Sequence, residues 1–581
     1  MRLISFLLII LLVYACSRKQ EKTLSPDERK AFVQDSIRKV RQKNFENTKI
    51  NSAEIIRQVL ESRQPGERYS VLNDELYASI LLPDFYVENG FKPLWIQHYD
   101  SLGKVFQMVS FIENAEFHGL DPNHYHLKAI TSQLNAFQND STLIYNALFL
   151  SNLDLLLTDA FFALASHIYL GKVDHENPEA QWGIQSKKPV PALYNNLKKM
   201  LSGTSVALAF KRFYPPHPGY EAMVNEAKRL KDFIAGDFTV TVNMSALSIK
   251  PGDTTEYLSA IKDKLAFLGL YKPDTLSMAQ VYDEKTVEAI KKLQVQYGYN
   301  ADGAIGRNTL KALNMPVKEC ISKLYVNMER LRWMPDSLET RYLLVNIADF
   351  TLNMFQNNDT LISMRTIVGN NYRETPVFNS RITYLVFSPS WTVPPTIQRD
   401  DVIPAVIKDP GYLARKNMIV YNSNGKQVDA GTIDWKRNGM RYTIRQSPGP
   451  QNALGKVKFM FPNKHNVYLH DTPTRGLFAR DERTFSSGCI RIEKPYELAK
   501  ILLSDMPGWT DDKIRQAMDS KTDKTVVLKS PVGVYLYYLT AWGNSTGEIH
   551  YRTDIYNRDE DILKALKQKS QIQGLAISAV L

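Results

Sequence analysis

Apolar residues recur every three or four positions from about residue 56 to residue 240, as they do along buried helices. Turn signals interrupt this pattern, for example at Gly119-Leu120-Asp121-Pro122 and Pro215-Pro216. Residues 56–245 are therefore predicted to form an all-helical domain. Residues 16–55 are rich in charged and amide side chains and poor in large apolar ones, which predicts a solvated tether with local helix.

Residues 246–316 are predicted to form a small unit of three helices. Tyr257 to Leu270 is amphipathic, and Asp283 suits the N-cap of a second helix. Tyr297 to Gly306 carries glycines that favour turns, and a third helix is expected from Asn308 onward. Residues 317–341 are then predicted to be a connecting helix.

From Tyr342 the pattern changes to short β-rich runs, and Asn357-Asn358-Asp359 between two of them is a hairpin signal. Residues 342–510 are therefore predicted to be a mainly-β sandwich. Prolines break the strand rhythm over about 393–450, which indicates an insertion. Two further strands are expected within 511–581, so the fold class is multidomain α+β.

The first residues have the pattern of a targeting segment. Arg2 precedes the apolar run Leu3 to Val13, which is too short for a membrane span. Val13-Tyr14-Ala15-Cys16 resembles a bacterial lipoprotein cleavage site, so residues 1–15 are predicted to be a signal peptide and Cys16 the lipidated residue. An ordinary signal peptide or an uncleaved anchor is the alternative. The rest is expected to be exported, soluble, and tied by lipid to a membrane of the cell envelope, facing the periplasm.

Net charge limits the classes of binding partner that are expected, and the cysteine content limits the possible disulfides. The net charge of +11 over 581 residues is a mild basic bias that suits cell-wall polymer or a lipid surface. Lys/Arg clusters interleaved with aromatics are missing from the sequence, so nucleic acid is not an expected partner. Apart from Cys16 there are two cysteines, and Cys320 at helical spacing is interpreted as a small buried hydrophobe. A disulfide between Cys320 and Cys489 is not expected.

Metal and cofactor chemistry is not predicted. His118, His124 and His126 lie close together in the sequence, but no nearby cysteine or suitable carboxylate pattern completes a metal site. These histidines are interpreted as structural or exposed.

The segment Tyr468 to Ile492 carries the candidate chemistry. His470 and Cys489 lie nineteen positions apart, and Cys489 ends the run Ser486-Ser487-Gly488-Cys489. A thiol attacks as thiolate, and a neighbouring imidazole can generate it, so a lowered pKa of the thiol is expected. The two side chains can meet if the histidine ends one strand and the cysteine begins another. The alternative is a buried structural cysteine with an unrelated surface histidine.

The order of these residues resembles the cysteine L,D-transpeptidases of bacterial cell-wall synthesis. Tyr468 to Pro473 matches the histidine motif of that family, and Ser486 to Arg491 matches its Ser-x-Gly-Cys-x-Arg signature. The resemblance is to the large multidomain branch. It implies that 56–245 is a scaffold domain, 246–316 a peptidoglycan-binding-like module, 393–450 a lid over the site, and 511–581 an extension of the catalytic domain.

The resemblance also implies roles for single residues. Cys489 is the expected nucleophile, His470 the general base and acid, and the Gly488 backbone amide a candidate oxyanion donor. Arg491, Tyr468, Trp391 and Ser487 are candidate substrate contacts, with a structural role open for Arg491 and a core role for Trp391. Ser487 stands where many smaller members carry a second histidine. The imidazole is expected to be held by a backbone carbonyl and not by Asp471.

The implied reaction joins third-position diamino acids of two stem peptides through a thioester on Cys489, with carbapenem-type compounds as inhibitors. Water or a protein lysine as acceptor remains an alternative, giving a carboxypeptidase or an attachment enzyme. A wall-binding scaffold without catalysis is the alternative from another class. The 246–316 module is expected to bind glycan, or else to orient or shield the site.

Overall fold

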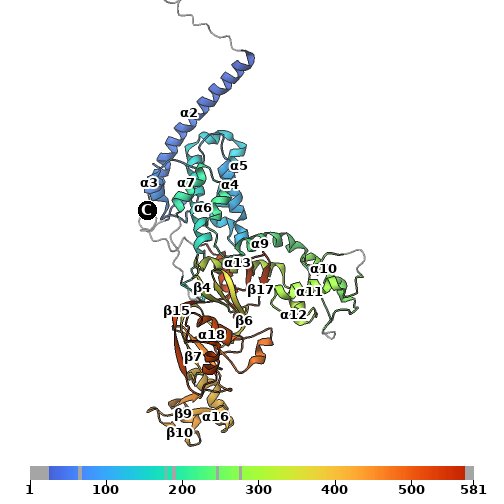
Figure 1. The fold of residues 1–581 in the computed structure, drawn as a ribbon. Helices are drawn as coiled ribbons and strands as arrows, with labels where there is room; N and C mark the ends of the chain where they lie inside the picture. The colour runs from blue at the N-terminus through green and yellow to red at the C-terminus, as the bar shows by residue number, and fades with distance from the viewer. Residues whose placement is uncertain are drawn as a thin grey trace, which may run out of the picture. The chain divides into compact units, whose positions relative to one another are not determined.

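The computed structural model describes residues 25–62, 68–176, 180–185, 192–243, 248–273 and 278–569, and Figure 1 traces their fold. The expected lipidation at Cys16 lies outside these residues. The chain divides into two compact units. The first comprises Met1–Glu113, Tyr125–Phe162 and Leu193–Ala209, and the second comprises Asn114–His124, Ala163–Ala192 and Phe210–Leu581.

The first unit begins with one long helix, α2, which spans Pro26–Glu61. Ser25 and Glu28 form a capping box, in which each side chain accepts a hydrogen bond from the other residue's backbone amide. The side chains are almost all exposed up to Asn44, and burial begins at Phe45. The predicted tether is therefore helical throughout its described part, because a strong cap starts a stretch without internal breakers.

The predicted helical pattern is confirmed in the rest of this unit, most clearly in α6 (Ala147–Leu170). This helix is long and apolar enough to cross a membrane, but 83% of its most apolar window is buried inside the protein. Two buried carboxylates on it fix distant loops: Asp154 accepts from the amides of Leu94 and Trp95, and Asp159 accepts from Tyr77 and Ala78. The other helices are α3 (Leu82–Glu88), α4 (Gly103–Glu113), α5 (Leu127–Asn139), η3 (Ser141–Tyr145), α7 (Leu193–Ser202) and α8 (Val206–Lys211).

The expectation of an all-helical N-terminal domain was wrong at two places. β1 (Ser70–Val71) and β2 (Asp74–Glu75) form a small hairpin, whose turn residues have positive φ angles. In the second unit, β3 (Trp182–Gly183) joins the large β-sheet. Elements this short leave too little periodicity to be detected in the sequence.

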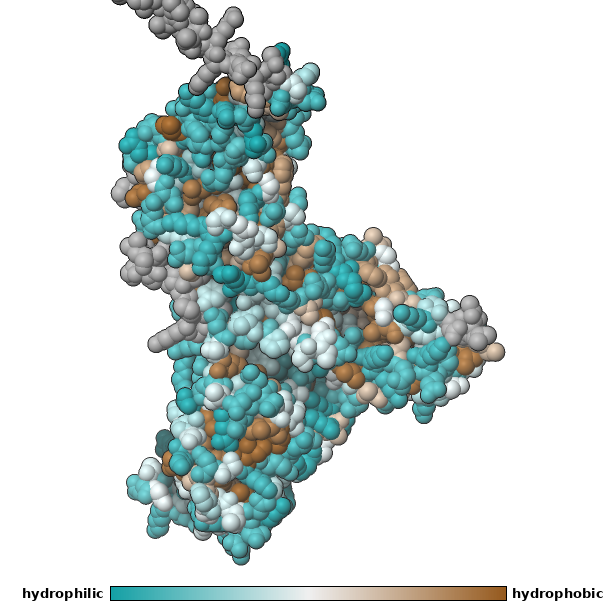
Figure 2. All heavy atoms as spheres, turned by 45° about the horizontal axis from the view of Figure 1, so that its top comes forward, coloured by the Kyte–Doolittle hydropathy of each residue, from teal (hydrophilic) through white to brown (hydrophobic). Residues whose placement is uncertain are grey.

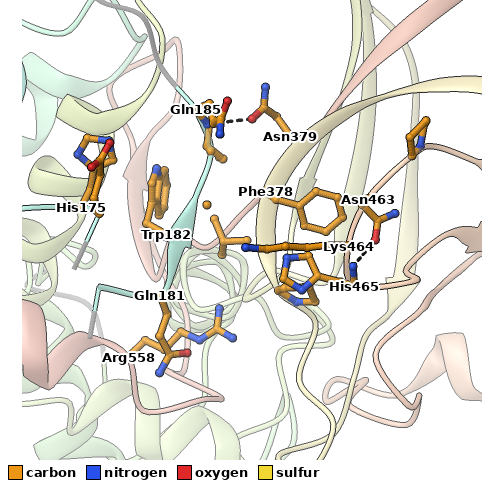
Figure 3. Close-up of a pocket in the computed structure, with 16 residues that line it drawn as sticks. His175, Gln181, Trp182, Gln185, Phe378, Asn379, Asn463, Lys464, His465 and Arg558 are labelled. Atoms are coloured by element: carbon orange, nitrogen blue, oxygen red, sulfur yellow. Dashed lines mark hydrogen bonds between the residues drawn. The ribbon is translucent and has the colours of Figure 1, made fainter. Parts of the chain in front are cut away.

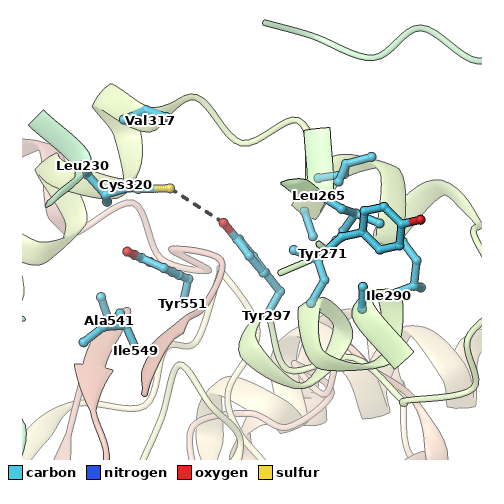
Figure 4. Packing of buried hydrophobic residues seen from close by; sticks show 14 of the residues in the cluster. Leu230, Leu265, Tyr271, Ile290, Tyr297, Val317, Cys320, Ala541, Ile549 and Tyr551 are labelled. Atoms are coloured by element: carbon cyan, nitrogen blue, oxygen red, sulfur yellow. Dashed lines mark hydrogen bonds between the residues drawn. The ribbon is translucent and has the colours of Figure 1, made fainter. Parts of the chain in front are cut away.

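The predicted three-helix module is present as α10 (Tyr257–Phe267), α11 (Glu284–Gln296) and α12 (Arg307–Leu313). Asp283 caps α11 as expected and accepts from the Thr286 amide at 2.8 Å. The core of the module is continuous with neighbouring elements, as the packing around Tyr297, Tyr551 and Cys320 in Figure 4 illustrates. These neighbours are α9 (Tyr220–Phe233), α13 (Val317–Trp333), β16 (Ala541–Gly543) and β17 (Ile549–Tyr551).

Cys320 behaves as predicted, as a buried hydrophobe in this shared core. It is 5% exposed, and its sulfur contacts the Tyr297 hydroxyl at 3.7 Å. Burial raises the pKa of the Cys320 thiol to about 12. Cys320 and Cys489 are both free thiols, in line with the expectation that they form no disulfide.

The predicted β domain is confirmed, as one nine-stranded sheet in the order β12-β13-β14-β6-β5-β4-β15-β7-β3. β12 also pairs with β7, so the sheet closes on itself instead of forming two separate sheets. β15 comes from the predicted C-terminal extension and lies between β4 and β7, which makes the extension an integral part of the sheet. The strands not yet bounded are β4 (Arg341–Asn346), β5 (Thr351–Gln356), β6 (Asp359–Ile367), β7 (Val377–Phe387), β12 (Val457–Met460), β13 (Leu469–His470), β14 (Ile490–Ile492) and β15 (Lys524–Tyr537).

The insertion at about 393–450 is a small subdomain with its own core and its own four-stranded sheet, β10-β9-β11-β8. In Figure 1, β9, β10 and α16 project beyond the end of β7. Its first strand, β8 (Trp391–Thr392), pairs with β11 (Thr443–Gln446). Its other elements are α14 (Pro395–Ile397), η6 (Gln398–Val402), α15 (Ile403–Lys408), α16 (Tyr412–Arg415), β9 (Met418–Tyr421), β10 (Gln427–Val428), η7 (Ala430–Thr432), α17 (Trp435–Asn438) and η8 (Gly439–Arg441).

The face of the molecule drawn in Figure 2 is mostly hydrophilic, with hydrophobic residues in small separate spots.

Several short elements complete the second unit. The remaining elements are η1 (Asn114–His118), η2 (Pro122–Tyr125), η5 (Ile234–Gly236), η9 (Arg475–Ala479), α18 (Pro495–Leu502), α19 (Asp511–Met518) and α20 (Asp559–Lys567).

Candidate functional site

The two candidate catalytic residues lie at the ends of neighbouring strands, as the sequence predicted. His470 is the last residue of β13, and Cys489 immediately precedes β14. The strands are parallel, with Leu469 paired with Ile490 and His470 paired with Arg491. The Ile490 amide donates to the Tyr468 carbonyl at 3.1 Å, which extends the hydrogen bonding between β13 and β14 by one residue.

This register brings four side chains to one face of the sheet. Alternation along each strand puts Tyr468 on the same face as His470, and Cys489 on the same face as Arg491. The pairing then sets Tyr468 beside Cys489 and His470 beside Arg491. The interpretation of an unrelated surface histidine is therefore wrong, because His470 is only 5% exposed and shares this face with the thiol.

A backbone carbonyl holds the imidazole, as expected. Nδ1–H of His470 donates to the Asp471 carbonyl at 2.6 Å, which leaves Nε2 with a free lone pair. The Asp471 carboxylate points elsewhere and accepts from the Lys456 amide. Burial, and next the charge of Arg491, lower the pKa of His470 to about 3. The imidazole is therefore neutral near pH 7 and can accept a proton.

The expectation of a lowered thiol pKa was wrong. Burial raises the pKa of the half-buried Cys489 thiol, although the backbone amide and hydroxyl of Tyr468 hydrogen-bond to the sulfur and oppose this shift. Sγ also lies 3.7 Å from the Asn466 carbonyl oxygen. At neutral pH the site therefore holds a neutral thiol with a neutral imidazole.

Trp391 reaches this face from the insertion. Its side chain hydrogen-bonds to the Tyr468 hydroxyl, which in turn hydrogen-bonds to Cys489. Burial, followed by the nearby sulfur, raises the pKa of Tyr468, so the phenol keeps its proton and remains a donor. Trp391 was predicted at the substrate site with a core role as the alternative. It is half-buried and links the inserted subdomain to the thiol.

The Gly488 amide is not available to an oxyanion, contrary to the prediction. It donates to the Ser486 Oγ at 3.2 Å. The Gly488 carbonyl accepts from the Thr375 hydroxyl at 2.9 Å, and the residue has a φ of +103° that favours glycine. Within the described part of the chain, no acceptor is found for the Cys489 amide. This amide replaces that of Gly488 as the candidate oxyanion donor.

Arg491 supports the loop that separates the two candidate catalytic residues. Its guanidinium donates to the Thr474 hydroxyl at 3.2 Å and to the Phe485 carbonyl at 3.3 Å, as the structural alternative predicted. Among the described residues, the hydrogen-bond partners of Arg491 include no carboxylate, and its Nε has no hydrogen-bond partner. The charge of Arg491 therefore remains available beside the thiol.

Two functional candidates were missed in the sequence. Lys458 on β12 is paired with His470 and lies 5.7 Å from the centre of the Tyr468 ring. Arg373 donates to the exposed Ser487 hydroxyl at 3.1 Å and forms ion pairs with Asp400 and Asp401 of the insertion. Neither carries a local motif, and only strand register and tertiary contact reveal them.

A cavity of about 980 Å³ is lined by residues of 175–176, 181–185, 376–379 and 462–465, with Arg558, and Figure 3 shows this lining. The Phe378 and His465 rings are 5.2 Å apart, and the Gln185 amide donates to the Asn379 side chain at 2.9 Å. The cavity is bounded by 462–465, in the same loop as Asn466, whose carbonyl contacts Cys489. His470 and Cys489 are not among the residues that line it.

The three clustered histidines are structural, as predicted. His118 hydrogen-bonds to the Tyr220 hydroxyl at 3.1 Å, and His124 to Lys172 at 2.7 Å. His126 lies between the carboxylates of Asp74 and Asp159. Within the described ranges, no group of His, Cys, Asp and Glu suited to a metal ion is found.

Comparison with known proteins agrees with this geometry. Residues 340–528 match the family described as "L,D-transpeptidase catalytic domain", residues 254–313 match "Putative peptidoglycan binding domain", and residues 81–226 match "Scaffold domain". A "Putative L,D-transpeptidase" of Haemophilus influenzae is 37% identical over 263 residues, which are 44% of this chain and 53% of that protein. The match thus spans about half the length of this relative.

Solved L,D-transpeptidase structures were also found. One from Stackebrandtia nassauensis is 15% identical, with a TM-score of 0.20, and covers 53% of this chain and 98% of its own. One from Xylanimonas cellulosilytica is 13% identical, with a TM-score of 0.18, and covers 50% of this chain and 98% of its own. On the family matches, this chain carries an L,D-transpeptidase catalytic domain at 340–528, preceded by a scaffold domain and a peptidoglycan-binding domain.

Proposed function

We propose that this protein cross-links peptidoglycan by acyl transfer through a thioester on Cys489. The observation that carries the proposal is the pairing of β13 with β14, which sets a neutral imidazole and a thiol on one face at adjoining strand ends. The catalytic-domain match over 340–528 supports the reaction class. The substrate is a stem peptide, cleaved between a diamino acid at the third position and a D-amino acid at the fourth.

In the first half-reaction, Nε2 of His470 takes the proton from Sγ of Cys489 while the sulfur bonds to the carbonyl carbon. The oxyanion accepts from the Cys489 amide, with the Tyr468 hydroxyl as a second candidate donor. His470 then gives the proton to the leaving nitrogen, the C–N bond breaks, and the D-amino acid departs. The thioester remains on the enzyme.

In the second half-reaction, the side-chain amine of another stem peptide attacks the thioester carbonyl. His470 takes a proton from this amine and returns it to the departing sulfur, so the thiol is restored and a new amide is formed. Arg491 and Lys458 supply positive charge near the site that suits the carboxylates of stem peptides.

The acceptor decides between cross-linking and its alternatives. Water would give a carboxypeptidase, and a protein lysine would give an attachment enzyme with the same two catalytic residues. The inserted subdomain favours an amine, because Trp391 and the Arg373 ion pairs bring it against the catalytic loop, where it can exclude water. Product analysis with purified stem peptides separates the three outcomes by mass.

Cys489→Ala is the test of the nucleophile. The variant is expected to lose cross-linking and to take up no carbapenem, as measured by intact mass. Cys320→Ala is the matched control, since Cys320 lies in the helical core, and it should keep both properties. Cross-links formed by Cys489→Ala would exclude Cys489 as the nucleophile. Loss of the carbapenem adduct in Cys320→Ala would show that the adduct forms on Cys320 and not on Cys489. Retention of binding without any turnover in the wild type would favour a scaffold.

We also propose that the protein is anchored in the cell envelope through lipid on Cys16. The support is the apolar run before that residue and the cell-wall substrate. Metabolic labelling with a fatty acid should mark the wild-type chain and leave Cys16→Ala unlabelled. An unlabelled wild type in the membrane fraction would instead indicate an uncleaved anchor.

A further inference from the structure

The side chain of Asp471 fixes the loop that follows His470. Its Oδ2 accepts from the Lys456 amide at 2.9 Å, and its Oδ1 accepts from Nη1 of Arg475 at 3.2 Å. The residue is buried, so these two bonds are largely shielded from water. Hydrogen bonds to a charged group are stronger than those between neutral groups. The carboxylate is therefore a firm anchor for the peptide unit next to the imidazole.

The backbone of Asp471 is held at the same point. Its amide donates to the Val457 carbonyl at 2.9 Å, which extends the pairing of β12 with β13 one residue beyond His470. Its carbonyl accepts from Nδ1–H of His470 at 2.6 Å. One residue thus bonds to the start of β12 through its amide and its side chain, and holds the imidazole through its carbonyl.

Gly455 fits closely against the Asp471 carboxylate. It has a φ of +60°, and a Cβ at this position would lie 2.5 Å from Cγ of Asp471. Any side chain at 455 would therefore displace that of Asp471. The turn before β12 is shaped to receive this carboxylate at the Lys456 amide.

Arg475 connects Asp471 to the strand that follows the cysteine. Its Nη1 donates to the Asp471 carboxylate, and its Nη2 donates to the carbonyl of Glu493, the residue directly after β14. One guanidinium therefore joins the ends of β13 and β14. Since His470 ends β13 and Cys489 precedes β14, this link contributes to the relative placement of imidazole and thiol.

We propose that Asp471 is a positioning residue, whose carboxylate holds the carbonyl that accepts from Nδ1–H of His470 and thereby keeps Nε2 free to take the proton of Cys489. The inference rests on the proposed function and deepens it. A neutral imidazole carries one N–H, and the hydrogen bond that this N–H makes decides which nitrogen is left as the acceptor. Without a fixed carbonyl, the proton can move to Nε2, and His470 in that tautomer is no general base.

Asp471→Asn is the test, because it keeps the shape of the side chain but has no charge and one acceptor oxygen. We expect kcat of the full-length enzyme to fall about tenfold with little change in KM, as for a misplaced catalytic group. The tautomer of His470 is measured in parallel by ¹⁵N NMR of histidine-labelled protein, with His470→Gln to assign the signal. The wild type should carry the proton on Nδ1, and Asp471→Asn should show both tautomers.

Two further variants separate position from charge. Arg475→Gln removes one hydrogen bond to the carboxylate at an exposed side chain, and should change kcat and the tautomer in the same direction by less. Asp519→Asn is the matched control. Its exposed carboxylate pairs with Nζ of Lys456, so a negative charge is lost beside the same residue while the bond to the Lys456 amide stays. It should leave kcat and the tautomer unchanged.

The outcomes separate the role of Asp471 from the reaction itself. A wild-type kcat in Asp471→Asn, a lower kcat with an unchanged tautomer, or an equal loss in Asp519→Asn would overturn the proposal. So would a wild-type proton on Nε2. If Asp471→Asn does not fold, Arg475→Gln decides by the same two measurements. If the wild type formed no cross-links while the tautomer still depended on Asp471, the proposed function would fail and the positioning of His470 would stand.

Discussion

Tyr468 and Cys489 lie opposite each other, each directly before one of the parallel strands β13 and β14. The phenol hydroxyl of Tyr468 donates a hydrogen bond to the sulfur of Cys489. Trp391 hydrogen-bonds to the same hydroxyl from the inserted subdomain. This chain of contacts stabilises the thiolate relative to the thiol, but burial outweighs it and keeps the pKa of Cys489 raised. In the proposed acyl transfer, the hydroxyl is therefore expected to stabilise the transition state, in which negative charge develops at sulfur and oxygen.

Tyr468→Phe removes this donor and leaves the ring in place. We expect kcat/KM to fall by about 10²-fold, the usual effect of losing one preorganised donor, and the alkylation of Cys489 by iodoacetamide to slow at pH 8. Trp391→Phe is the control, because it keeps the phenol and loses only the hydrogen bond made to it. A Tyr468→Phe enzyme with wild-type rates would show that the hydroxyl has no part in catalysis.

The protonation states predict an unusual pH profile. Because the pKa of His470 is lowered to about 3, the imidazole stays neutral down to that pH, and kcat/KM should not decline near pH 6.5 as it does for an ordinary histidine base. Because the pKa of Cys489 is raised, direct alkylation should keep increasing past pH 9, the ordinary value of a thiol. Alkylation complete below pH 7 would indicate a resting thiolate–imidazolium pair instead.

The location of the site could be predicted from the sequence because its chemistry is local. A histidine that ends one strand and a cysteine that begins another share a face in only a few registers, and the flanking apolar residues Leu469 and Ile490 fix which one. The insertion and the three-helix module could also be predicted, the first from prolines that interrupt the strand rhythm and the second from apolar residues at helical spacing before the strands begin.

The electrostatics of the site could not be predicted, because they depend on what covers it. The pKa of Cys489 follows from burial by the surrounding chain, and the Gly488 amide is used by a serine two residues away. Lys458 and Arg373 reach the site from separate strands and loops, with no motif around either. Such contacts depend on tertiary structure, which the order of residues does not display.

Arg373 is expected to hold the inserted subdomain against the catalytic loop. Its guanidinium contacts the Ser487 hydroxyl and the carboxylates of Asp400 and Asp401, which lie in the π-helical turn η6. Arg373→Gln should speed hydrogen exchange in 398–402 by several-fold, since partly exposed ion pairs contribute about 0.2–1 kcal/mol each. It should also raise the fraction of thioester lost to water, measured by product mass.

Arg399→Gln is the matched control for this contact. Arg399 pairs with Asp400 but not with the catalytic loop, and its side chain is 64% exposed. It should leave both the exchange rates and the product ratio close to those of the wild type. Equal changes in Arg373→Gln and Arg399→Gln would mean that general charge, and not the link to Ser487, explains the effect.

His126 makes the stability of the first unit depend on pH. The imidazole is buried between Asp159 and Asp74, at 2.7 and 2.9 Å, and these partners overcome the cost of burial and raise the pKa of His126 to about 9. Because its pKa is raised in the folded state, protonated His126 contributes its full stabilisation of the fold below the unfolded-state pKa of 6.5. This stabilisation is lost as the pH rises to 9. His126→Gln should therefore lower the free energy of unfolding by about 3 kcal/mol at pH 6 and by much less at pH 9.5, as measured by urea unfolding.

His98→Gln is the control. It alters an exposed contact with Asp100 and should leave the free energy of unfolding unchanged at both pH values. A His126→Gln penalty that is the same at both pH values would show that the histidine acts by packing alone.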